Sequence, residues 1–273
     1  MLHDTRRRAL EVAQFLRSRR SRLAPSADEL RARPRRRVAG LTRGEIAARA
    51  GVSLTWYSWL EMGRDVRASP QTLTSIARAL ELNPDETSYL LTLAAIPHGD
   101  GSARASEFGA DELAALVDGM HDYPAFVVDR RWSVVAANRH AREIYRFVPS
   151  DDLNANVLWR LVRDPHLRRL HADPDAMMRS IAAIVRYNFA DDPENAQLAN
   201  LIDALHRDAV FSAAWETYSV RTFAPFDTEI RWNALTLRFR FVALAAGFTR
   251  RETLVVHLPA DDATRSALTN GAP

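Results

Sequence analysis

The fold of the N-terminal part is decided by residues 42–62, TRGEIAARAGVSLTWYSWLEM. Thr42 stands three positions before Glu45, a pair that can satisfy the free amides at the start of a helix. Gly51 can adopt a positive φ and so end that helix, and Ser53 can cap a second one. The stretch therefore predicts two short helices joined by a tight turn.

The spacing of apolar residues gives these two helices an inner and an outer face. The residues expected to pack inward are Ile46, Ala50, Val52, Tyr57 and Leu60. The residues expected to face away from them are Ser53, Leu54, Thr55, Ser58 and Trp59. A helix that is braced by another across a tight turn and exposes its first turns suits the major groove of DNA. A plain helical hairpin would explain the apolar spacing but not the charge.

Positive charge is concentrated at the N-terminal end. Residues 1–70 hold 16 Arg against 7 Asp or Glu, a net charge of +9, whereas the remainder holds 21 Arg against 27 acids, a net charge of −6. There is no Lys, so these cations are guanidinium groups that can bind a phosphate or the edge of guanine. Genomic base composition would account for a high Arg content but not for its clustering. The charge favours double-stranded DNA as a partner.

Two kinds of DNA contact are expected from these features. The side chains assigned to base edges in the groove are Ser53, Thr55, Ser58 and Trp59. The side chains assigned to phosphates are Arg35, Arg36, Arg37, Arg43 and Arg64. We also expect a homodimer on DNA, because two recognition helices about one DNA turn apart bind a palindrome more tightly than one.

Composition limits the class of protein. The 273 residues leave room for two domains, and contents of 47% hydrophobic and 26% charged residues are typical of globular proteins. The chain has no Cys, which excludes disulfides, thiolate zinc sites and cysteine nucleophiles and fits a reducing cytoplasm. No apolar run approaches the length of about 18 residues that a membrane helix needs. We therefore expect a cytoplasmic protein that does not insert into membranes.

The pattern changes from all-helical to mixed along the chain. Further helices over 6–20, 70–80 and 84–94 complete a five-helix domain at 1–96, and a turn-rich linker follows at 97–104. A second domain is expected at 105–262, before a flexible tail at 263–273. Its strands are predicted at 125–128, 132–138, 218–222, 235–241 and 253–258, with helices in between. The fold class is therefore α+β, with one antiparallel sheet covered by helices.

Several motifs in combination resemble the MmyB-like regulators, whose N-terminal domain is an Xre or lambda-repressor-like helix-turn-helix. They are Arg-Arg-Arg-Val-x-Gly-Leu at 35–41, Gly-Val-Ser at 51–53, an aromatic pair at 56–57 and Leu-Glu-x-Gly-Arg-Asp at 60–65. In the second domain, 124–138 resembles the opening hairpin of the family, and 156–158 with 163–165 resembles its next helix. The resemblance covers nearly the whole chain.

The resemblance implies a bacterial transcription factor whose PAS-like second domain holds a small apolar effector, such as a fatty acid, without a covalent bond. Trp59 departs from the family, which often carries a polar or Arg side chain at this position. A Trp cannot form the forked hydrogen bonds of Arg to guanine. It therefore either makes apolar contact in the groove or leaves base reading to Ser53, Thr55 and Ser58, and the target sequence cannot be carried over.

The effector site is predicted between the sheet and the helices. Its expected apolar lining comprises Phe126, Trp132, Val135, Trp159, Ile181, Phe239 and Phe241. Its expected polar anchors are Asn138, at the end of the second strand, and His257, on the last strand. The same spacings also fit an ordinary core, and a His in a strand is often satisfied by a neighbouring group.

Enzymatic activity is not expected. The chain lacks a Gly-x-Ser-x-Gly elbow, a Gly-x-Gly-x-x-Gly turn and a Gly-Lys-Ser phosphate loop. His166 and His171 are five positions apart and do not share one helical face, so we predict neither a metal nor a cofactor. Two alternatives to a ligand-sensing regulator stay open. In one the second domain docks a protein partner and has no small-molecule effector, and in the other it is a DNA-tethered enzyme.

Overall fold

The computed structural model describes residues 2–32, 38, 40–64, 66–94, 109–147, 153–190, 193, 195–246 and 252–269. The expected linker at 97–104 and the basic residues Arg35, Arg36 and Arg37 lie outside this part of the chain. The chain forms two compact units. Unit 1 consists of Met1–Asp100, Ala183–Ala199 and Ala214–Thr222. Unit 2 consists of Gly101–Ala182, Asn200–Ala213 and Phe223–Pro273.

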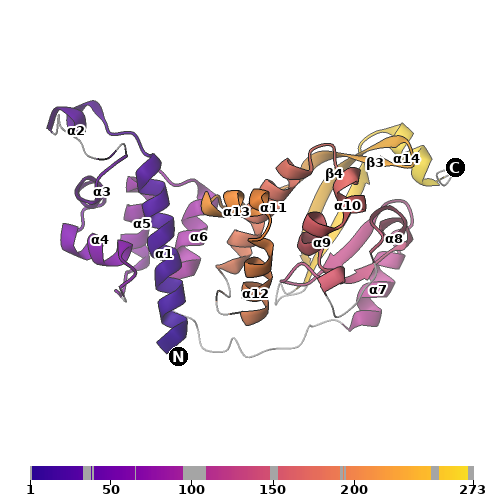
Figure 1. Cartoon of the computed structure of the whole chain (residues 1–273), viewed down its shortest axis with the longest axis horizontal. Coiled ribbons are helices and arrows are strands. Elements are labelled where there is room, and N and C mark those ends of the chain that lie inside the picture. The colour runs from indigo at the N-terminus through magenta and orange to yellow at the C-terminus, as the bar shows by residue number, and fades with distance from the viewer. Residues whose placement is uncertain are drawn as a thin grey trace. The chain divides into compact units, whose positions relative to one another are not determined.

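Unit 1 is built from helices (Figure 1). Its N-terminal helices are α1 (Leu2–Arg22), α2 (Ala27–Ala32), α3 (Arg43–Ala50), α4 (Leu54–Glu61), α5 (Pro70–Ala79) and α6 (Pro84–Ala94). Helix α1 packs against α4 and α6, and α3 packs against α4 and α5. The five expected helices are present, and the short α2 lies in the stretch before α3 that was expected to be a polar connection.

The two helices of the helix-turn-helix have the predicted ends. The Thr42 side chain accepts a hydrogen bond from the Glu45 amide, and the Glu45 carboxylate accepts one from the Thr42 amide. Gly51 has a φ of 68° at the end of α3, a conformation that strains residues with a Cβ. The Ser53 hydroxyl accepts a hydrogen bond from the Trp56 amide and so caps α4. The helix-turn-helix predicted from these neighbouring residues is therefore confirmed.

The core of unit 1 is apolar and continuous. Ile46 and Tyr57 are fully buried between α3 and α4, as predicted. Other members from α1, α5 and α6 include Phe15, Leu16, Leu73, Ile76, Leu80, Tyr89 and Leu90. Burial of each such side chain stabilises the fold by about 1.5–3 kcal/mol. Ala190 and Val220 join the same core, so residues far along the chain complete the bundle.

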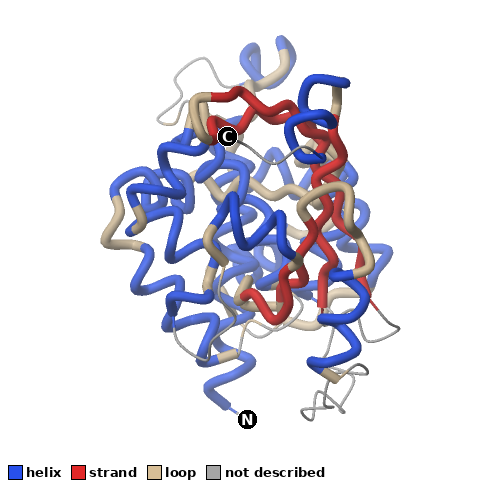
Figure 2. Tube along the Cα trace, turned by 90° about the vertical axis from the view of Figure 1, so that its right-hand side faces the viewer, coloured by secondary structure: helices blue, strands red, loops and turns tan. Residues whose placement is uncertain are grey.

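Unit 2 contains a five-stranded antiparallel sheet in the order β2-β1-β5-β4-β3. The strands are β1 (Ala125–Val128), β2 (Val134–Ala137), β3 (Phe226–Trp232), β4 (Leu235–Ala246) and β5 (Glu252–Pro259). Figure 2 shows them in red as one sheet. Register places Phe126 opposite Val255 and Phe241 opposite His257.

Helices pack on this sheet. Those whose residues all lie in unit 2 are α7 (Ala110–Asp118), α8 (Arg139–Tyr145), the 3-10 turn η1 (Leu153–Ala155), α9 (Val157–Arg163), α10 (Pro165–Leu170) and α14 (Asp262–Thr269). Leu113 and Val117 of α7 pack against the sheet residues Ala125, Val127, Ala136, Leu254 and Val256. The predicted α+β class, with a helical domain followed by a sheet with helices, is confirmed.

Three helices contain residues of both units along their length. They are α11 (Pro174–Phe189), α12 (Ala196–Leu205) and α13 (Ala209–Glu216). The divisions fall after Ala182 in α11, after Ala199 in α12 and after Ala213 in α13. Two stretches of the region predicted as a second domain thus belong to the same compact unit as the helix-turn-helix.

Two expectations from the sequence are wrong. The stretch 218–222 is not a strand, because Tyr218 has a φ of 52° and the Ser219 amide turns back to the Thr217 hydroxyl. The residues from 263 do not all form a flexible tail, because α14 runs to Thr269 and buries Leu268. In α14 the Thr264 hydroxyl accepts a hydrogen bond from the Arg238 amide of β4, which ties the helix to the sheet.

Candidate functional site

The first turns of α4 are open to solvent. Leu54 is 53% exposed and Trp59 is 39% exposed, while Ser53 and Thr55 are also exposed and Ser58 is half-buried. The hydroxyl of Ser53 already accepts the Trp56 amide, so part of its hydrogen-bonding capacity serves the cap. The predicted outer face of the recognition helix is therefore present, with Thr55 and Ser58 nearest its middle.

Arg64 and Trp59 lie together at the end of α4. The Arg64 guanidinium lies 5.7 Å from the centre of the Trp59 ring, and the Arg64 amide donates to the Trp59 carbonyl at 3.0 Å. A cation over an indole face is attracted by about 0.5–1 kcal/mol at an exposed site. This contact holds the Arg64 charge beside the outer face of α4.

Glu61 is a buried carboxylate shared by several arginines. Its oxygens accept from Arg20 at 2.6 and 2.7 Å and from Arg43 at 3.0 Å. Burial raises the pKa of Glu61, but the hydrogen bonds and charges of Arg20 and Arg43 outweigh burial and hold the pKa below its usual value. Because these residues come from α1, α3 and α4, the cluster fixes the end of the recognition helix. Arg43, assigned to phosphate, thus also braces the fold.

Five aromatic side chains in unit 2 gather around one buried histidine, and we call the six residues the His257 cluster. Its members are Phe126, Tyr145, Phe147, Phe239, Phe241 and His257. The centre of the His257 ring lies 3.8 Å from that of Phe241 and 5.1 Å from that of Tyr145. The rings come from β1, β4, β5, α8 and the residues just after α8, so the cluster covers one face of the sheet.

The polar atoms of this region have no hydrogen-bond partner among the described residues. They are both ring nitrogens of His257, the Tyr145 hydroxyl and Nδ1 of His171. A buried polar atom without a partner costs about 1–3 kcal/mol, and such atoms are uncommon in folded proteins. The cluster therefore combines an apolar shell with polar atoms that are able to bind a further group.

These polar groups are uncharged at neutral pH. Burial lowers the pKa of His257 to about 3, with a smaller contribution from His171. Burial also lowers the pKa of His171 to about 4 and raises that of Tyr145 well above its usual value. A neutral imidazole has one donor and one acceptor nitrogen, and a phenol is both donor and acceptor. The region therefore suits a hydrogen-bonding group without charge.

The structure brings only some of the predicted ligand residues together. Phe126, Phe239, Phe241 and His257 belong to the His257 cluster. Trp132 is linked to it through Phe223, whose ring centre lies 6.4 Å from Trp132 and 5.9 Å from Phe241.

The other apolar candidates lie elsewhere. Val135 packs with the α7 residues Leu113 and Val117. Trp159 carries the Arg163 guanidinium at 5.1 Å, and we find no ring contact from it to the His257 cluster within the described residues. Ile181 is buried on α11. The spacing of apolar residues in the sequence therefore did not distinguish members of the His257 cluster from ordinary core residues.

Asn138 has a structural role. Its amide nitrogen donates to the carbonyls of Met120 and Tyr123 at 2.7 and 2.9 Å, and its amide oxygen accepts from the amides of Ala125 and Ala141. These bonds use both donors and both lone pairs of the side chain. Asn138 thus caps α8 and holds β1, and it has no hydrogen-bonding capacity left for an effector.

Sequence reasoning missed Tyr145, Phe147 and His171. A helix over 139–145 with Ala141, Ile144 and Tyr145 on one buried face was a usable signal for the tyrosine. His171 directly follows α10, and the residues beside it in the sequence do not predict that it is buried. It forms an isolated β-bridge with Ile230 of β3. Contacts between distant segments decide its place.

Within the residues that the structure describes, no group of three or more His, Asp or Glu side chains is placed to hold a metal ion. None of the described helices is both long and apolar enough to span a bilayer.

Family comparison agrees with the two parts of the chain. Residues 11–90 match a model described as a helix-turn-helix domain. Residues 110–270, more than half of the chain, match the model of the MmyB-like transcription regulator ligand binding domain. A search of curated proteins found no significant match. The chain therefore belongs to the MmyB-like transcription regulators, and its two domains are those of a DNA-binding regulator with a ligand-binding domain.

Proposed function

We propose that this regulator binds a small apolar molecule of the fatty-acyl class at the His257 cluster, and that occupancy changes its affinity for DNA. The observation that carries the proposal is the set of buried polar atoms without partners inside an aromatic shell. An apolar chain gains about 25 cal/mol for each Å² removed from water against such rings. Its polar end would supply the hydrogen bonds that His257 and Tyr145 lack.

The electrostatics favour an uncharged polar end. Arg160, whose guanidinium lies 5.3 Å from the Phe147 ring, already donates to the Asp164 carboxylate and to the carbonyls of Tyr145 and Arg146. His257 is neutral because burial lowers its pKa to about 3. A carboxylate there would lack a counter-charge, which is costly in a buried site. A protonated acid, an alcohol or an amide at the end of an apolar chain fits better.

For DNA, we propose that α4 enters the major groove and that Thr55, Ser58 and Trp59 read base edges. Arg43 and Arg64 would then bind phosphates, with Arg35, Arg36 and Arg37 alongside. Exposure of the α4 face and the cation beside Trp59 support this assignment. We further propose a homodimer on DNA, because paired recognition helices suit a palindromic site.

The test uses the full-length protein. Mass spectrometry of the denatured sample should release one apolar compound per chain. Tetradecan-1-ol, titrated by calorimetry, should bind wild type, and tetradecanoic acid, which is ionised at neutral pH, should bind more weakly. Tyr145→Phe should weaken binding about tenfold, the effect of losing one hydrogen bond worth about 1.4 kcal/mol. Tyr123→Phe, a partly buried tyrosine beside the α7 core, is the matched control and should bind as wild type.

The contrary result is equally clear. If nothing is released and neither probe binds, the ligand proposal fails. The alternative in which the ligand-binding domain docks a protein partner would then be preferred. If both probes bind but Tyr145→Phe and His257→Phe have no effect, the ligand lies elsewhere in the domain.

A further inference from the structure

Part of the ligand-binding domain is folded into the DNA-binding unit. The family match to that domain covers residues 110–270, yet Ala183–Ala199 and Ala214–Thr222 belong to unit 1 together with the helix-turn-helix. Ala190 and Val220 lie in the apolar core of unit 1. These segments therefore take part in the same packing that holds the recognition helix.

A buried arginine fixes these segments. Arg186 of α11 is 1% exposed, forms an ion pair with Glu11 of α1 and donates to the Trp215 carbonyl at 2.7 Å. Its guanidinium lies 3.9 Å from the Trp215 ring centre and 4.2 Å from that of Tyr218. A buried cation is stable only when it is paired and hydrogen-bonded, so this arrangement requires α1, α11 and the end of α13 together.

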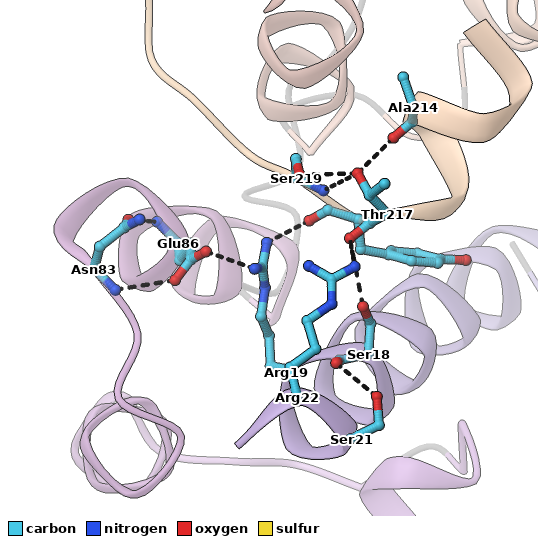
Figure 3. Close-up of polar contacts among 10 residues, drawn as sticks. Ser18, Arg19, Ser21, Arg22, Asn83, Glu86, Ala214, Thr217 and Ser219 are labelled. Atoms are coloured by element: carbon cyan, nitrogen blue, oxygen red, sulfur yellow. Dashed lines mark hydrogen bonds and ion pairs between the residues drawn. The ribbon is translucent and has the colours of Figure 1, made fainter. Parts of the chain in front are cut away.

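Residues 217–222, which follow α13, are hydrogen-bonded to α1 and α6. We call this segment the strap. The carbonyls of Thr217 and Tyr218 accept hydrogen bonds from Arg22 and Arg19 of α1 (Figure 3). Arg19 also forms an ion pair with Glu86 of α6 (Figure 3), and the two charged groups lie 2.8 Å apart.

The end of the strap is bound to α6 as well. The amide and hydroxyl of Thr222 donate to the Asp85 carboxylate at 3.0 and 2.8 Å. Asp85 lies in the first turn of α6. The strap thus contacts the bundle at both of its ends.

Helix α1 carries the strap and the recognition helix on different sides. Arg19 and Arg22 bind the strap, whereas the neighbouring Arg20 binds Glu61 at the end of α4. Consecutive helical residues point about 100° apart, so Arg19 and Arg20 address different neighbours from the same turn. A shift of that helical turn would therefore displace the hydrogen-bonding groups that hold both the strap and α4.

The other end of the strap reaches the proposed ligand site through one peptide bond. Phe223 follows Thr222, and its ring centre lies 5.9 Å from Phe241 and 6.0 Å from Phe226. Phe241 in turn lies 3.8 Å from His257. Consecutive Cα atoms are about 3.8 Å apart, so Phe223 and Thr222 keep this separation when either of them moves.

We infer that the strap couples the His257 cluster to the DNA-binding unit, with Phe223 responding to the cluster and Thr222 transmitting its position to α6 and α1 through Asp85. This inference rests on the proposed function, because it assigns a regulatory route to the same ligand site. Coupling between two sites typically changes affinity about 5- to 150-fold. The strap residues are positioning residues that touch neither DNA nor ligand in this scheme.

The first experiment measures DNA affinity with and without a probe. The full-length protein is titrated against a duplex chosen by in vitro selection, in the presence or absence of tetradecan-1-ol. Wild type should show a change in Kd of about fivefold or more. Thr222→Val and Asp85→Asn should bind the probe as wild type but show a change of less than about twofold. Thr236→Val, at an exposed threonine of β4, is the matched control and should keep the full change.

The second experiment needs no ligand. Hydrogen exchange of α1 and α6 is compared between wild type and His257→Phe, which alters the cluster directly. We expect altered exchange in both helices, and no alteration when His257→Phe is combined with Thr222→Val. Unaltered exchange in His257→Phe would overturn the inference, and so would a full probe response in the Thr222 and Asp85 variants. Failure of the probe to bind wild type would count against the proposed ligand alone, because this second experiment still tests the strap.

Discussion

One buried polar cluster in unit 1 and one in unit 2 differ in how far their hydrogen-bonding groups are satisfied. In unit 1, Arg186 is paired with Glu11, hydrogen-bonded to a carbonyl and stacked between two rings, and the Tyr89 hydroxyl donates to the same Glu11 at 2.7 Å. In unit 2, His257 and Tyr145 are equally buried, but their polar side-chain atoms have no hydrogen-bond partner among the described residues.

This difference separates a buried polar group that stabilises the fold from one that we propose binds a ligand. A buried ionic group with all its partners raises the cost of unfolding, because removal of one partner strands the others. A buried polar atom without partners lowers stability in the free protein and becomes useful only when something binds to it.

Removal of Arg186 should have the largest effect. Arg186→Met leaves Glu11, which is 12% exposed, without its cation and should lower the free energy of unfolding by about 3–5 kcal/mol. Urea denaturation measures the change. Arg139→Met breaks the exposed pair with Glu143 and is the control, whose midpoint should stay at the wild-type value. Equal midpoints for the two variants would show that the buried pair is no stronger than a surface one.

Asn138 offers the same comparison inside unit 2. Asn138→Ala strands the amide of Ala125 and the carbonyls of Met120 and Tyr123, and should cost about 2–3 kcal/mol. Asn200→Ala, at an exposed position of α12, should be nearly neutral. A neutral Asn138→Ala would mean that water replaces these bonds freely.

Acid should destabilise the protein through His257. Its pKa is about 3 when folded and about 6.5 in an unfolded chain, so the unfolded state binds more protons between these values. Stability is therefore fully present above about pH 6.5 and falls by about 1.4 kcal/mol per pH unit below it. Denaturation at pH 7.5, 6 and 5 should show this slope reduced in His257→Phe but kept in the exposed control His121→Gln. An identical slope in all three proteins would contradict the burial of neutral His257.

The smallest effect on stability is expected for Tyr145, which we compare with the buried Tyr89. Tyr145→Phe removes a hydroxyl without a partner and should change stability by less than about 1 kcal/mol, in either direction. Tyr89→Phe removes a donor to the Glu11 carboxylate and should cost about 1.5–3 kcal/mol. The difference between the two variants, measured by thermal unfolding, sharpens the contrast between the units. A reversed order would remove the basis for treating Tyr145 as part of a site.

Local features could be predicted from the sequence because they depend on neighbouring residues. The Thr42 and Glu45 box, the turn at Gly51 and the Ser53 cap act over three or four positions, and each is present. The strand predicted at 235–241 is present, and its alternation holds at Leu237 and Phe239, which are buried, but not at Leu235, which is 37% exposed.

Features that depend on distant residues could not be predicted. Arg186 precedes Tyr187 on α11, and because arginine is usually exposed, its burial could not be predicted from its neighbours. Its partner Glu11 lies 175 positions away in the sequence. The aromatic and β-branched residues of 218–222 favour a strand by propensity, but contacts with α1 and α6 override that preference. Two side chains were expected to be polar anchors for an effector. The hydrogen-bonding groups of the Asn138 side chain are all occupied within the fold, whereas the ring nitrogens of His257 have no partner among the described residues.

The interleaving of the chain has a consequence for protein engineering. Repressor chimeras are commonly conceived as one module joined to another at a linker, but here the bundle that carries the recognition helix is completed by Ala183–Ala199 and Ala214–Thr222. A transplant that ended near residue 96 would leave behind Arg186, Ala190 and Val220, and with them the cation paired with Glu11 and part of the core. Exchange of DNA specificity in this protein is therefore best attempted within the intact chain, on the face of α4 that we propose enters the major groove.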